Sequence, residues 1–505
     1  MIYFVTSIET MLTSSIEKAQ ARRVEMFDSL DQSSQIVTLQ YNYDHYDVEK
    51  KLGVQGRVTN IFQYFQKLSF HEDCSSIDQR IINYALNQPD YHVSSDRSTA
   101  MGKDGKKRVK IAYYHQRLYS IAYFDRWGFI DRCDFYDYGC LSYTDFYEDR
   151  GRLVMRQYYN NHGLPVITYY YRGRDNNDPV LTLIRLNDGR LIKLFDTIEE
   201  FRAYFFERLA SENDHVAFIS DRSDFALKAF DLMKSHAKRY QIFHYLFTTD
   251  GHVDGPLYDV YKPIPGMLKR NTLNGIISLT KREANEVCQR FNTNQCYQIP
   301  VMSVTEKLLK KQIPFEQRKK GQLIGVARIA PYKRLDHLVK VTIRLHKDFD
   351  FVDLKIYGTP DDQKVADQLK QLVKDHHAEE YIHFCGFQQD LSKIYETADM
   401  EVMTSVHEGL PMSLLEAQSH ACPAVSYDIN YGPSDIIEDG VSGKLVPAGD
   451  IDALNNTLKT LLTDRKKLEE YSNNAQAAAS RFSFTNISKR WADFLHAEGL
   501  WVEPK

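Results

Sequence analysis

The chain has 505 residues, which at roughly 100–200 residues per domain predicts three or four domains. Apolar residues make up 43% and charged residues 26% of the sequence, a composition that excludes wholesale disorder. With 64 basic and 68 acidic residues the net charge is −4, so nucleic acid is not an expected partner. No apolar run approaches the roughly 18 residues that a membrane helix needs.

Cysteine usage and the N-terminus both bear on the cellular compartment. The seven cysteines are scattered and form no C-x-x-C pair, which argues against a disulfide framework or a zinc cage and favours a reducing cytosol. The N-terminus starts apolar but meets Glu9 early and lacks a basic leader, so a signal peptide is not expected. A cytoplasmic protein is therefore predicted.

The first part of the chain alternates strand and helix patterns. Apolar residues 2–5 and 36–41 predict strands on either side of an amphipathic helix over 14–27, as in a parallel α/β sheet. The same pattern resumes after residue 197. Its predicted strands are 216–220, 241–244 and 275–279, and its predicted helices are 198–210, 222–234 and 281–291.

Between these two stretches the sequence pattern changes to that of consecutive hairpins rich in aromatic residues. Alternating aromatic and polar residues end at Gly128, Gly139, Gly151 and Gly163, spaced 11, 12 and 12 residues apart. A further Asn-Asp-Gly turn follows at 187–189. This pattern predicts an antiparallel β-meander inserted in the first α/β domain. Its aromatic residues either pack the sheet or form a surface for oligomer contact or a polymeric acceptor.

A second α/β pattern follows a polar, basic stretch at 314–322, which we interpret as a linker. The predicted strands are 323–328, 354–358, 382–386, 400–404 and 424–427, and the predicted helices start near 335 and cover 361–375, 390–397 and 411–421. A final amphipathic stretch, 484–500, is expected to pack back across the domains. The predicted boundaries are 1–95 and 198–312 for the first domain, 96–197 for the meander, 313–483 for the second domain and 484–505 for the C-terminal helix.

Charged residues and glycines follow several strands of the second domain. Arg328, Lys333, Gly358, Gly386 and Glu408 all lie where a predicted strand ends or just beyond it. In open parallel sheets, ligands bind outside these carboxyl ends. Fixed positive charge, together with backbone that a ligand can approach closely, suits a diphosphate.

The segment SVHEGLPMSLLEAQ carries the strongest local pattern. Glu408 and Glu416 are eight residues apart and flank the step at which strand becomes helix. Pro411 suits the first helical turn, and the free amides there favour an anion. Glu416 is positioned to accept hydrogen bonds from ribose hydroxyls, and Glu408 to lie near a transferred group. The alternative is that both are ordinary helix-start carboxylates.

Together these motifs resemble a known family. The E-x7-E pattern of Glu408 and Glu416, the R-x4-K pair of Arg328 and Lys333, and residues 431–446 resemble the retaining GT-B enzymes of glycosyltransferase family 4. The chain is most similar to the poly(glycerol-phosphate) and poly(ribitol-phosphate) α-glycosyltransferases of wall teichoic acid, and to related protein O-glycosyltransferases. The resemblance implies an α/β fold of two Rossmann-like domains facing a cleft, with the meander inserted in the first.

The resemblance also implies a reaction and its residues. The expected reaction is transfer of glucose or GlcNAc from a UDP-sugar with retention, without a metal ion or other cofactor, the leaving phosphate helping to deprotonate the acceptor. The implied catalytic residues are Arg328, Lys333, Glu408 and His244. The implied donor-binding residues are Glu416, Gly409, Leu410, Pro411, Met412, Gly386, Phe387, Thr13 and Ser14.

The sequence departs from the family's pattern in two places. Where relatives have a glycine-containing phosphate loop, residues 9–14 contain no glycine, so Ser14 is left to bind through its hydroxyl. Where relatives have a His-rich loop on the acceptor side, this chain has His244 and then only His252. Each of these histidines is interpreted as either functional or merely structural.

The sequence alone does not decide which acceptor or which partners the protein binds. The acceptor is either anionic teichoic acid polymer or Ser/Thr of a surface protein, and a third hypothesis makes the chain a non-catalytic partner subunit. A homo-oligomer or a hetero-complex with a homologous subunit is expected. The basic runs at 310–311 and 318–320 are either solvated surface or attract an anionic polymer or the inner membrane leaflet. Asp361 and Asp362 are either a helix start or a metal-binding pair.

Overall fold

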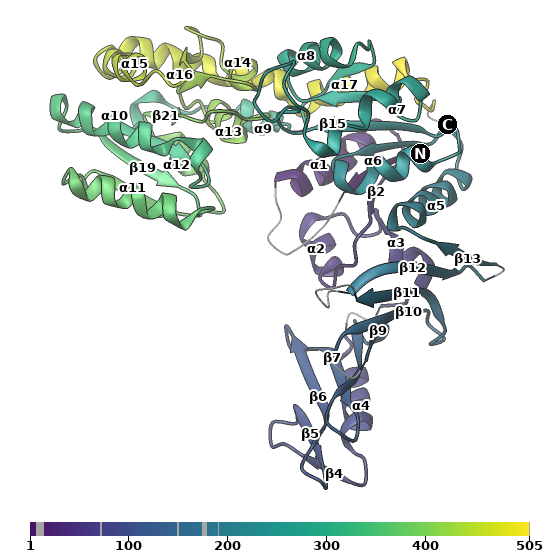
Figure 1. Ribbon diagram of the computed structural model, residues 1–505. Coiled ribbons are helices and arrows are strands. Elements are labelled where there is room, and N and C mark those ends of the chain that lie inside the picture. Colours follow the sequence, from purple (N-terminus) through teal and green to yellow (C-terminus); the bar gives the residue numbers. More distant parts are fainter. Residues whose placement is uncertain (7–14, 71–72, 149–150, 174–178, 190, 504–505) are drawn as a thin grey trace.

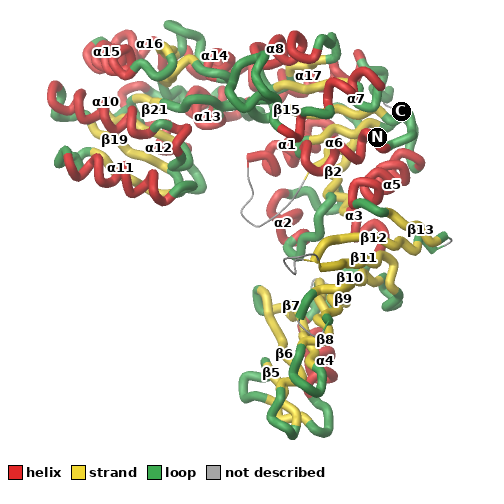
Figure 2. Tube along the Cα trace, in the orientation of Figure 1, coloured by secondary structure: helices red, strands yellow, loops and turns green. Residues whose placement is uncertain are grey.

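The computed structural model describes residues 1–6, 15–70, 73–148, 151–173, 179–189 and 191–503. Two α/β parts lie side by side, and a long antiparallel sheet extends away from the first of them (Figure 1). In each α/β part, helices pack against a parallel sheet (Figure 2). The predicted fold class, two Rossmann-like domains with an inserted β-meander, is confirmed.

The first α/β part is built on a seven-stranded parallel sheet in the order β17-β16-β15-β14-β1-β2-β3. All five residues of β1 are buried, as parallel strands covered on both faces require, which explains the uninterrupted apolar run at the N-terminus. The strands are β1 (Ile2–Thr6), β2 (Ser34–Thr38), β3 (Val58–Asn60), β14 (Ala217–Ser220), β15 (Lys238–Phe243), β16 (Gly275–Ser278) and β17 (Cys296–Gln298). The helices are α1 (Ser15–Ser29), α2 (His45–Leu52), α3 (Ile61–Gln66), α5 (Ile198–Ser211), α6 (Ser223–Leu232), α7 (Ile264–Arg270), α8 (Lys281–Phe291) and α9 (Glu306–Leu309).

The second α/β part is built on a six-stranded parallel sheet in the order β20-β19-β18-β21-β22-β23. The strands are β18 (Gln322–Val326), β19 (Asp353–Tyr357), β20 (Ile382–Gly386), β21 (Met400–Met403), β22 (Ala424–Asp428) and β23 (Gly443–Pro447). The helices are α10 (Leu335–Asp348), α11 (Gln363–Asp375), α12 (Ser392–Thr397), α13 (Met412–Ser419), α14 (Pro433–Ile436), α15 (Ile451–Thr463), α16 (Arg465–Ala479) and α17 (Phe484–Ala497).

The inserted sheet is antiparallel and has ten strands in sequence order, with α4 (Ser75–Leu86) packed against it. The glycines at 128, 139, 151 and 163 close its hairpin turns with φ between 70° and 90°, as predicted. The strands are β4 (Tyr91–Val93), β5 (Thr99–Gly102), β6 (Lys107–Tyr114), β7 (Arg117–Phe124), β8 (Ile130–Asp137), β9 (Cys140–Tyr147), β10 (Leu153–Tyr159), β11 (Pro165–Gly173), β12 (Pro179–Asn187) and β13 (Ile192–Phe195).

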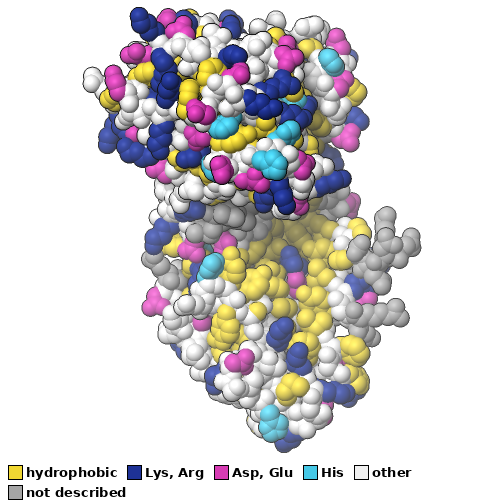
Figure 3. Space-filling model, turned by 90° about the vertical axis from the view of Figure 1, so that its left-hand side faces the viewer, with side chains coloured by type: hydrophobic (Ala, Val, Ile, Leu, Met, Phe, Trp, Pro, Cys, Tyr) yellow, Lys and Arg dark blue, Asp and Glu magenta, His cyan; other side chains and the backbone are white. Residues whose placement is uncertain are grey.

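Aromatic residues of the meander serve mainly as its packing. Tyr143, Tyr158 and Tyr169 are buried, and the Tyr143 ring stacks on Phe135 with centroids 4.4 Å apart. Tyr158 also contacts Phe62 of α3, so the same stripe joins the meander to the first α/β part. Figure 3 shows hydrophobic side chains gathered on the face that lies below the C-terminal part, which itself carries many charged side chains.

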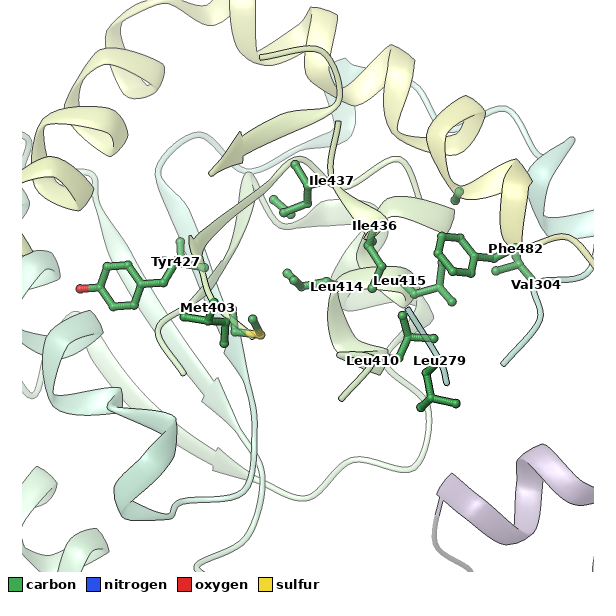
Figure 4. Close-up of a cluster of buried hydrophobic side chains, with 14 of the residues drawn as sticks. Leu279, Val304, Met403, Leu410, Leu414, Leu415, Tyr427, Ile436, Ile437 and Phe482 are labelled. Carbon is green, nitrogen blue, oxygen red and sulfur yellow. The ribbon is translucent and has the colours of Figure 1, made fainter. Parts of the chain in front are cut away.

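The two α/β parts share apolar contacts. Leu279, which follows β16, lies beside Leu410 of the second part, and Val304 lies beside Phe482 (Figure 4). The final helix α17 packs against the first part, with the Trp491 ring 6.0 Å from that of Phe4. These contacts join the two α/β parts beside the cavity described below.

The basic run at 318–320 is only partly solvated, so the surface interpretation is wrong for Arg318. This side chain is buried and donates hydrogen bonds to the carbonyl oxygens of Tyr395 and Ala398 at 2.9 and 2.7 Å. It also binds the carbonyl of His420 at 3.1 Å. Arg318 therefore ties the start of the second α/β part to the interior of that part.

Candidate active site

A cavity of about 420 Å³ lies between the two α/β parts, at the carboxyl ends of strands from both sheets. Most of the predicted site residues line it: His244, Arg328, Lys333, Glu408, Gly409, Leu410, Pro411, Met412 and Glu416. The lining also contains residues that the sequence did not single out: Tyr245, Leu279, Val301, Val326, Tyr332 and Ser413.

Lys333 and Glu408 form an ion pair inside the cavity. Both side chains are largely buried, at 14% and 12% exposed. Ser405 donates a hydrogen bond of 2.7 Å to the same carboxylate oxygen that Lys333 binds. The cation and the carboxylate thus neutralise each other and are fixed in position before any ligand arrives.

Arg328 lies at the mouth of the cavity and is 60% exposed. Its Nη1 pairs with Asp361 at 2.9 Å, and its Nη2 donates to the Tyr332 hydroxyl at 2.6 Å. The guanidinium is therefore oriented from two sides while one face stays open to solvent. Such an exposed, oriented cation can bind a diphosphate through paired hydrogen bonds.

The N-terminus of α13 faces the same cavity. The helix begins at Met412, one residue later than predicted, because Pro411 precedes it with φ −71° and ψ 103°, and no side chain among the described residues caps this end. The first amides of a helix have no intrahelical acceptor, so the N–H groups of Met412 and Ser413 can bind an anion. The helix dipole adds to the positive potential of Arg328 and Lys333.

Glu416 lies deeper in α13 and lines both this cavity and an adjoining one of about 290 Å³. Burial raises the pKa of this carboxyl, although the Tyr395 hydroxyl donates to it at 3.2 Å and opposes the shift. Lys18 and Phe387 line the adjoining cavity too. Gly386, the last residue of β20, lies just before Phe387 but lines neither cavity.

The first α/β part closes the cavity from the opposite side. A Cβ placed on Gly409 would overlap the carbonyl oxygen of His244, so the two backbones meet there. The Tyr245 hydroxyl bonds the His407 ring across the same gap, and that ring stacks on Tyr332 at 5.3 Å. Burial lowers the pKa of His407, which favours its neutral form.

The two histidines that the family resemblance singled out, His244 and His252, differ in their positions. His244 lines the cavity, and its Nε2 lies 2.9 Å from the carboxylate of Asp221. His252 is exposed and is not among the cavity-lining residues. The other predicted contacts of the first α/β part, Thr13 and Ser14 in the glycine-less loop, lie outside the described residues.

No group of three or more His, Cys, Asp or Glu side chains in the described ranges is arranged to hold a metal ion. The acidic pair after β19 has separate structural roles. Asp362 caps α11 by accepting from the amide of Lys364 at 2.9 Å, which confirms the helix-start interpretation, and Asp361 pairs with Arg328. Among the same residues, no helix is long and apolar enough to cross a membrane.

Comparison with known families gives this cavity a context. Residues 306–478, which include every cavity-lining residue of the second α/β part, match the family described as glycosyl transferases group 1. The chain carries a group 1 glycosyltransferase domain. The glycosyltransferase is also similar along nearly its whole length to curated proteins.

One relative is the poly(ribitol-phosphate) α-N-acetylglucosaminyltransferase of Staphylococcus aureus (strain COL), 24% identical over 94% of this chain and 95% of its own. Another is the GtfA subunit of the UDP-N-acetylglucosamine–peptide N-acetylglucosaminyltransferase of Limosilactobacillus reuteri subsp. suis, 23% identical over 96% of both chains.

Two solved structures resemble the glycosyltransferase over almost all of its length. That of TarM has a TM-score of 0.81 at 19% identity and covers 97% of this chain and 98% of its own. That of the pneumococcal O-GlcNAc transferase GtfA, in complex with UDP and GlcNAc, has a TM-score of 0.78 at 21% identity, covering 98% of each chain. At these identities the likeness establishes the GT-B fold, and the chemistry has to be argued from the site.

Proposed function

We propose that the protein is a retaining α-glycosyltransferase that transfers GlcNAc or glucose from a UDP-sugar to hydroxyls of a poly(polyol phosphate), the wall teichoic acid class of acceptor. The observation that carries the proposal is the convergence of Arg328, Lys333, Glu408 and Glu416 around the open N-terminus of α13 in one cavity. The proposal assigns the donor to residues 313–483 and the acceptor side to 1–95 and 198–312.

The donor's diphosphate would lie between Arg328 and the start of α13. Charge builds up on the leaving phosphate in the transition state, so fixed cations there lower the barrier. Lys333 would exchange part of its ion pair with Glu408 for the diphosphate, which frees Glu408 to contact the sugar. The cost of breaking the pair is offset by the new charge-assisted bonds.

The nucleoside would occupy the adjoining cavity. Glu416 is placed to accept hydrogen bonds from the ribose hydroxyls, and the backbone at Gly386 and Phe387 follows β20 at the edge where the base would lie. Transfer would occur on one face of the sugar, with the leaving phosphate helping to deprotonate the acceptor hydroxyl. No metal ion is assigned a role in this scheme.

A second candidate function is transfer of the sugar to Ser or Thr of a surface protein. Its support is the similarity to the peptide N-acetylglucosaminyltransferase subunit, which is as extensive as the similarity to the poly(ribitol-phosphate) enzyme. A related solved structure is a GtfA/B complex. A homo-oligomer or a hetero-complex through the exposed edge strand β13, where Leu194 is 61% exposed, belongs to the same proposal.

Release of UDP by the purified chain tests the proposal and separates the acceptors. UDP-GlcNAc and UDP-glucose are each supplied alone, with poly(ribitol phosphate), with poly(glycerol phosphate), or with a Ser/Thr-rich polypeptide. We expect one donor to be used and its turnover to rise with a polyol phosphate. Stimulation by the polypeptide alone would transfer the assignment to a protein acceptor, and no release from either donor would reject the function.

A further inference from the structure

Beneath the cavity wall, His244 is bound by a buried ion pair that the proposed reaction does not use directly. We propose that Asp221 is a positioning residue that acts through His244, with Arg23 as its fixed counter-ion. The catalytic consequence rests on the proposed function, whereas the geometry does not. Asp221 follows β14 and is completely buried, and its Oδ1 lies 2.9 Å from His244 Nε2.

Arg23 of α1 holds the carboxylate with both terminal nitrogens. Nη1 donates to Oδ2 at 2.9 Å and Nη2 donates to Oδ1 at 3.1 Å. The guanidinium also packs against the neighbouring rings of Phe4 and Trp491, at 4.7 and 5.3 Å from their centroids. The final helix α17 carries Trp491 and therefore helps to fix Arg23, which in turn holds the carboxylate that contacts His244.

The two oxygens of Asp221 are not equivalent. Gln20 donates to Oδ2 at 2.9 Å in addition to Arg23, whereas Oδ1 receives one bond from Arg23 and faces His244. Burial alone would raise the pKa of Asp221, but Arg23 and His244 outweigh it and keep the pKa below its usual range. The carboxylate is a permanent acceptor, so Nε2 of His244 has to carry a proton.

This arrangement sets the tautomer of the imidazole. With the proton held on Nε2, neutral His244 presents an unprotonated Nδ1, which bonds no residue that the structure describes. The side chain is 18% exposed and lines the cavity with Lys333 and Glu408, next to Tyr245. Nδ1 is thus an acceptor left for a hydroxyl of the donor sugar or of the incoming polyol.

Stability alone is a weak reason to retain such a pair. Replacing a buried ion pair with apolar side chains of similar volume is often neutral or stabilising. Here the pair also leaves Arg23 Nε and Gln20 Oε1 buried without a partner in the described part of the chain. The pair thus carries an energetic cost and lies directly behind a cavity-lining histidine, which favours a role in orienting that histidine.

The variant Asp221→Asn has a specific expected effect. Because Arg23 and Gln20 both donate at the Oδ2 position, the amide oxygen will take that position and the NH₂ group will face His244. An NH₂ donor requires an unprotonated Nε2, so the proton moves to Nδ1 and the free acceptor is lost. Asp231→Asn is the matched control, since Asp231 of α6 pairs with Arg270 of α7 at 2.7 Å, outside the cavity.

Two measurements on the full chain test the proposal. The first is the tautomer of His244 at pH 8 by ¹⁵N–¹H correlation after histidine-selective labelling, with the His244→Gln variant giving the assignment. We expect the Nε2–H form in the wild type and in Asp231→Asn, and the Nδ1–H form in Asp221→Asn. An unchanged tautomer in Asp221→Asn would overturn the proposal whatever the enzyme does.

The second measurement is a double-mutant cycle on transfer. Asp221→Asn should lower kcat/KM by about tenfold or more in the wild type and by less than about twofold in a His244→Gln background, while the Kd for UDP stays unchanged. Equal losses in both backgrounds would show that Asp221 does not act through His244. A tautomer change with no transfer from any UDP-sugar would reject the function and leave the positioning role standing.

Discussion

Gly409 and His244 bring the two α/β parts into backbone contact at the wall of the cavity, because a Cβ on Gly409 would overlap the His244 carbonyl oxygen. Any larger residue at position 409 must therefore separate the two parts or displace the loop before α13. Both changes would move Glu408 and the first amides of α13 away from the acceptor side. The contact makes the chemistry sensitive to the spacing between the parts.

Gly409→Ala should accordingly reduce transfer by at least about a hundredfold while leaving the thermal midpoint within a few degrees of the wild type, because misplacement of reacting groups by about 1 Å has that cost. UDP release and thermal unfolding measure the two effects. Gly266→Ala in α7 is the control, since its added Cβ meets only the flexible end of Arg270. Wild-type turnover in Gly409→Ala would contradict the close approach.

Lys333→Ala should weaken UDP binding by about 10- to 100-fold, the usual loss for a charge-assisted hydrogen bond of about 1.5–3 kcal/mol. It also leaves Glu408 unpaired in a largely buried position. Isothermal titration with UDP measures the effect. Lys340→Ala removes a more exposed pair with Asp336 on α10 and should leave UDP binding unchanged. Equal affinities of the two variants for UDP would show that Lys333 does not contribute to donor binding.

Glu401 of β21 gives the C-terminal part a pH-dependent stability. Burial raises its pKa to about 8, opposed by a hydrogen bond from Ser413 and reinforced by Glu416. A raised carboxyl pKa stabilises the fold below the unfolded value near 4.5, and this stability is lost as the pH rises through about 8. The loss is up to about 1.4 kcal/mol per pH unit within that window.

Glu401→Gln should therefore be increasingly stabilised relative to the wild type as the pH rises from 5 to about 8.5. Urea unfolding at several pH values measures the difference. The exposed Glu379→Gln variant, compared in the same way, should show no such trend. A difference that stays constant with pH would mean that Glu401 titrates normally in the folded protein.

Arg318→Met should destabilise the C-terminal part by about 3 kcal/mol or more, because it leaves several buried carbonyl oxygens without a donor. Chemical unfolding measures the change, and Lys319→Met, at the neighbouring exposed position, should change stability by less than about 0.5 kcal/mol. Comparable stabilities of the two variants would contradict the buried role of Arg318.

The sequence was sufficient to predict most of the longer parallel strands and to group several residues that line the cavity, because both depend on local patterns. It did not predict the strands β3, β17 and β23. Buried parallel strands such as β1 are continuous apolar runs, and the residues just beyond them lie at one edge of the sheet. Arg328, Lys333 and Glu408 could therefore be placed together without any knowledge of side-chain contacts. The glycine turns of the meander are equally local, because each needs a positive φ.

The residues that the sequence missed depend on contacts between distant segments. Tyr245 meets His407 across 162 positions, and Arg23 meets Asp221 across 198, so no spacing rule links either pair. The burial of Arg318 could not be predicted from the sequence for the same reason. A basic run normally indicates solvated surface, and only the folded chain brings four backbone carbonyl groups, from near the ends of α12 and α13, to the Arg318 guanidinium.

The most direct test of the central claim, that this cavity transfers a sugar from UDP with retention, is the ¹H NMR spectrum of the reaction mixture. UDP-GlcNAc or UDP-glucose is incubated with poly(ribitol phosphate) and either the wild-type chain or Lys333→Ala. We expect the signal of an α-linked product that grows as UDP is released by the wild type and is absent with Lys333→Ala. A β-linked product, or an α-linked product formed equally well by Lys333→Ala, would contradict it.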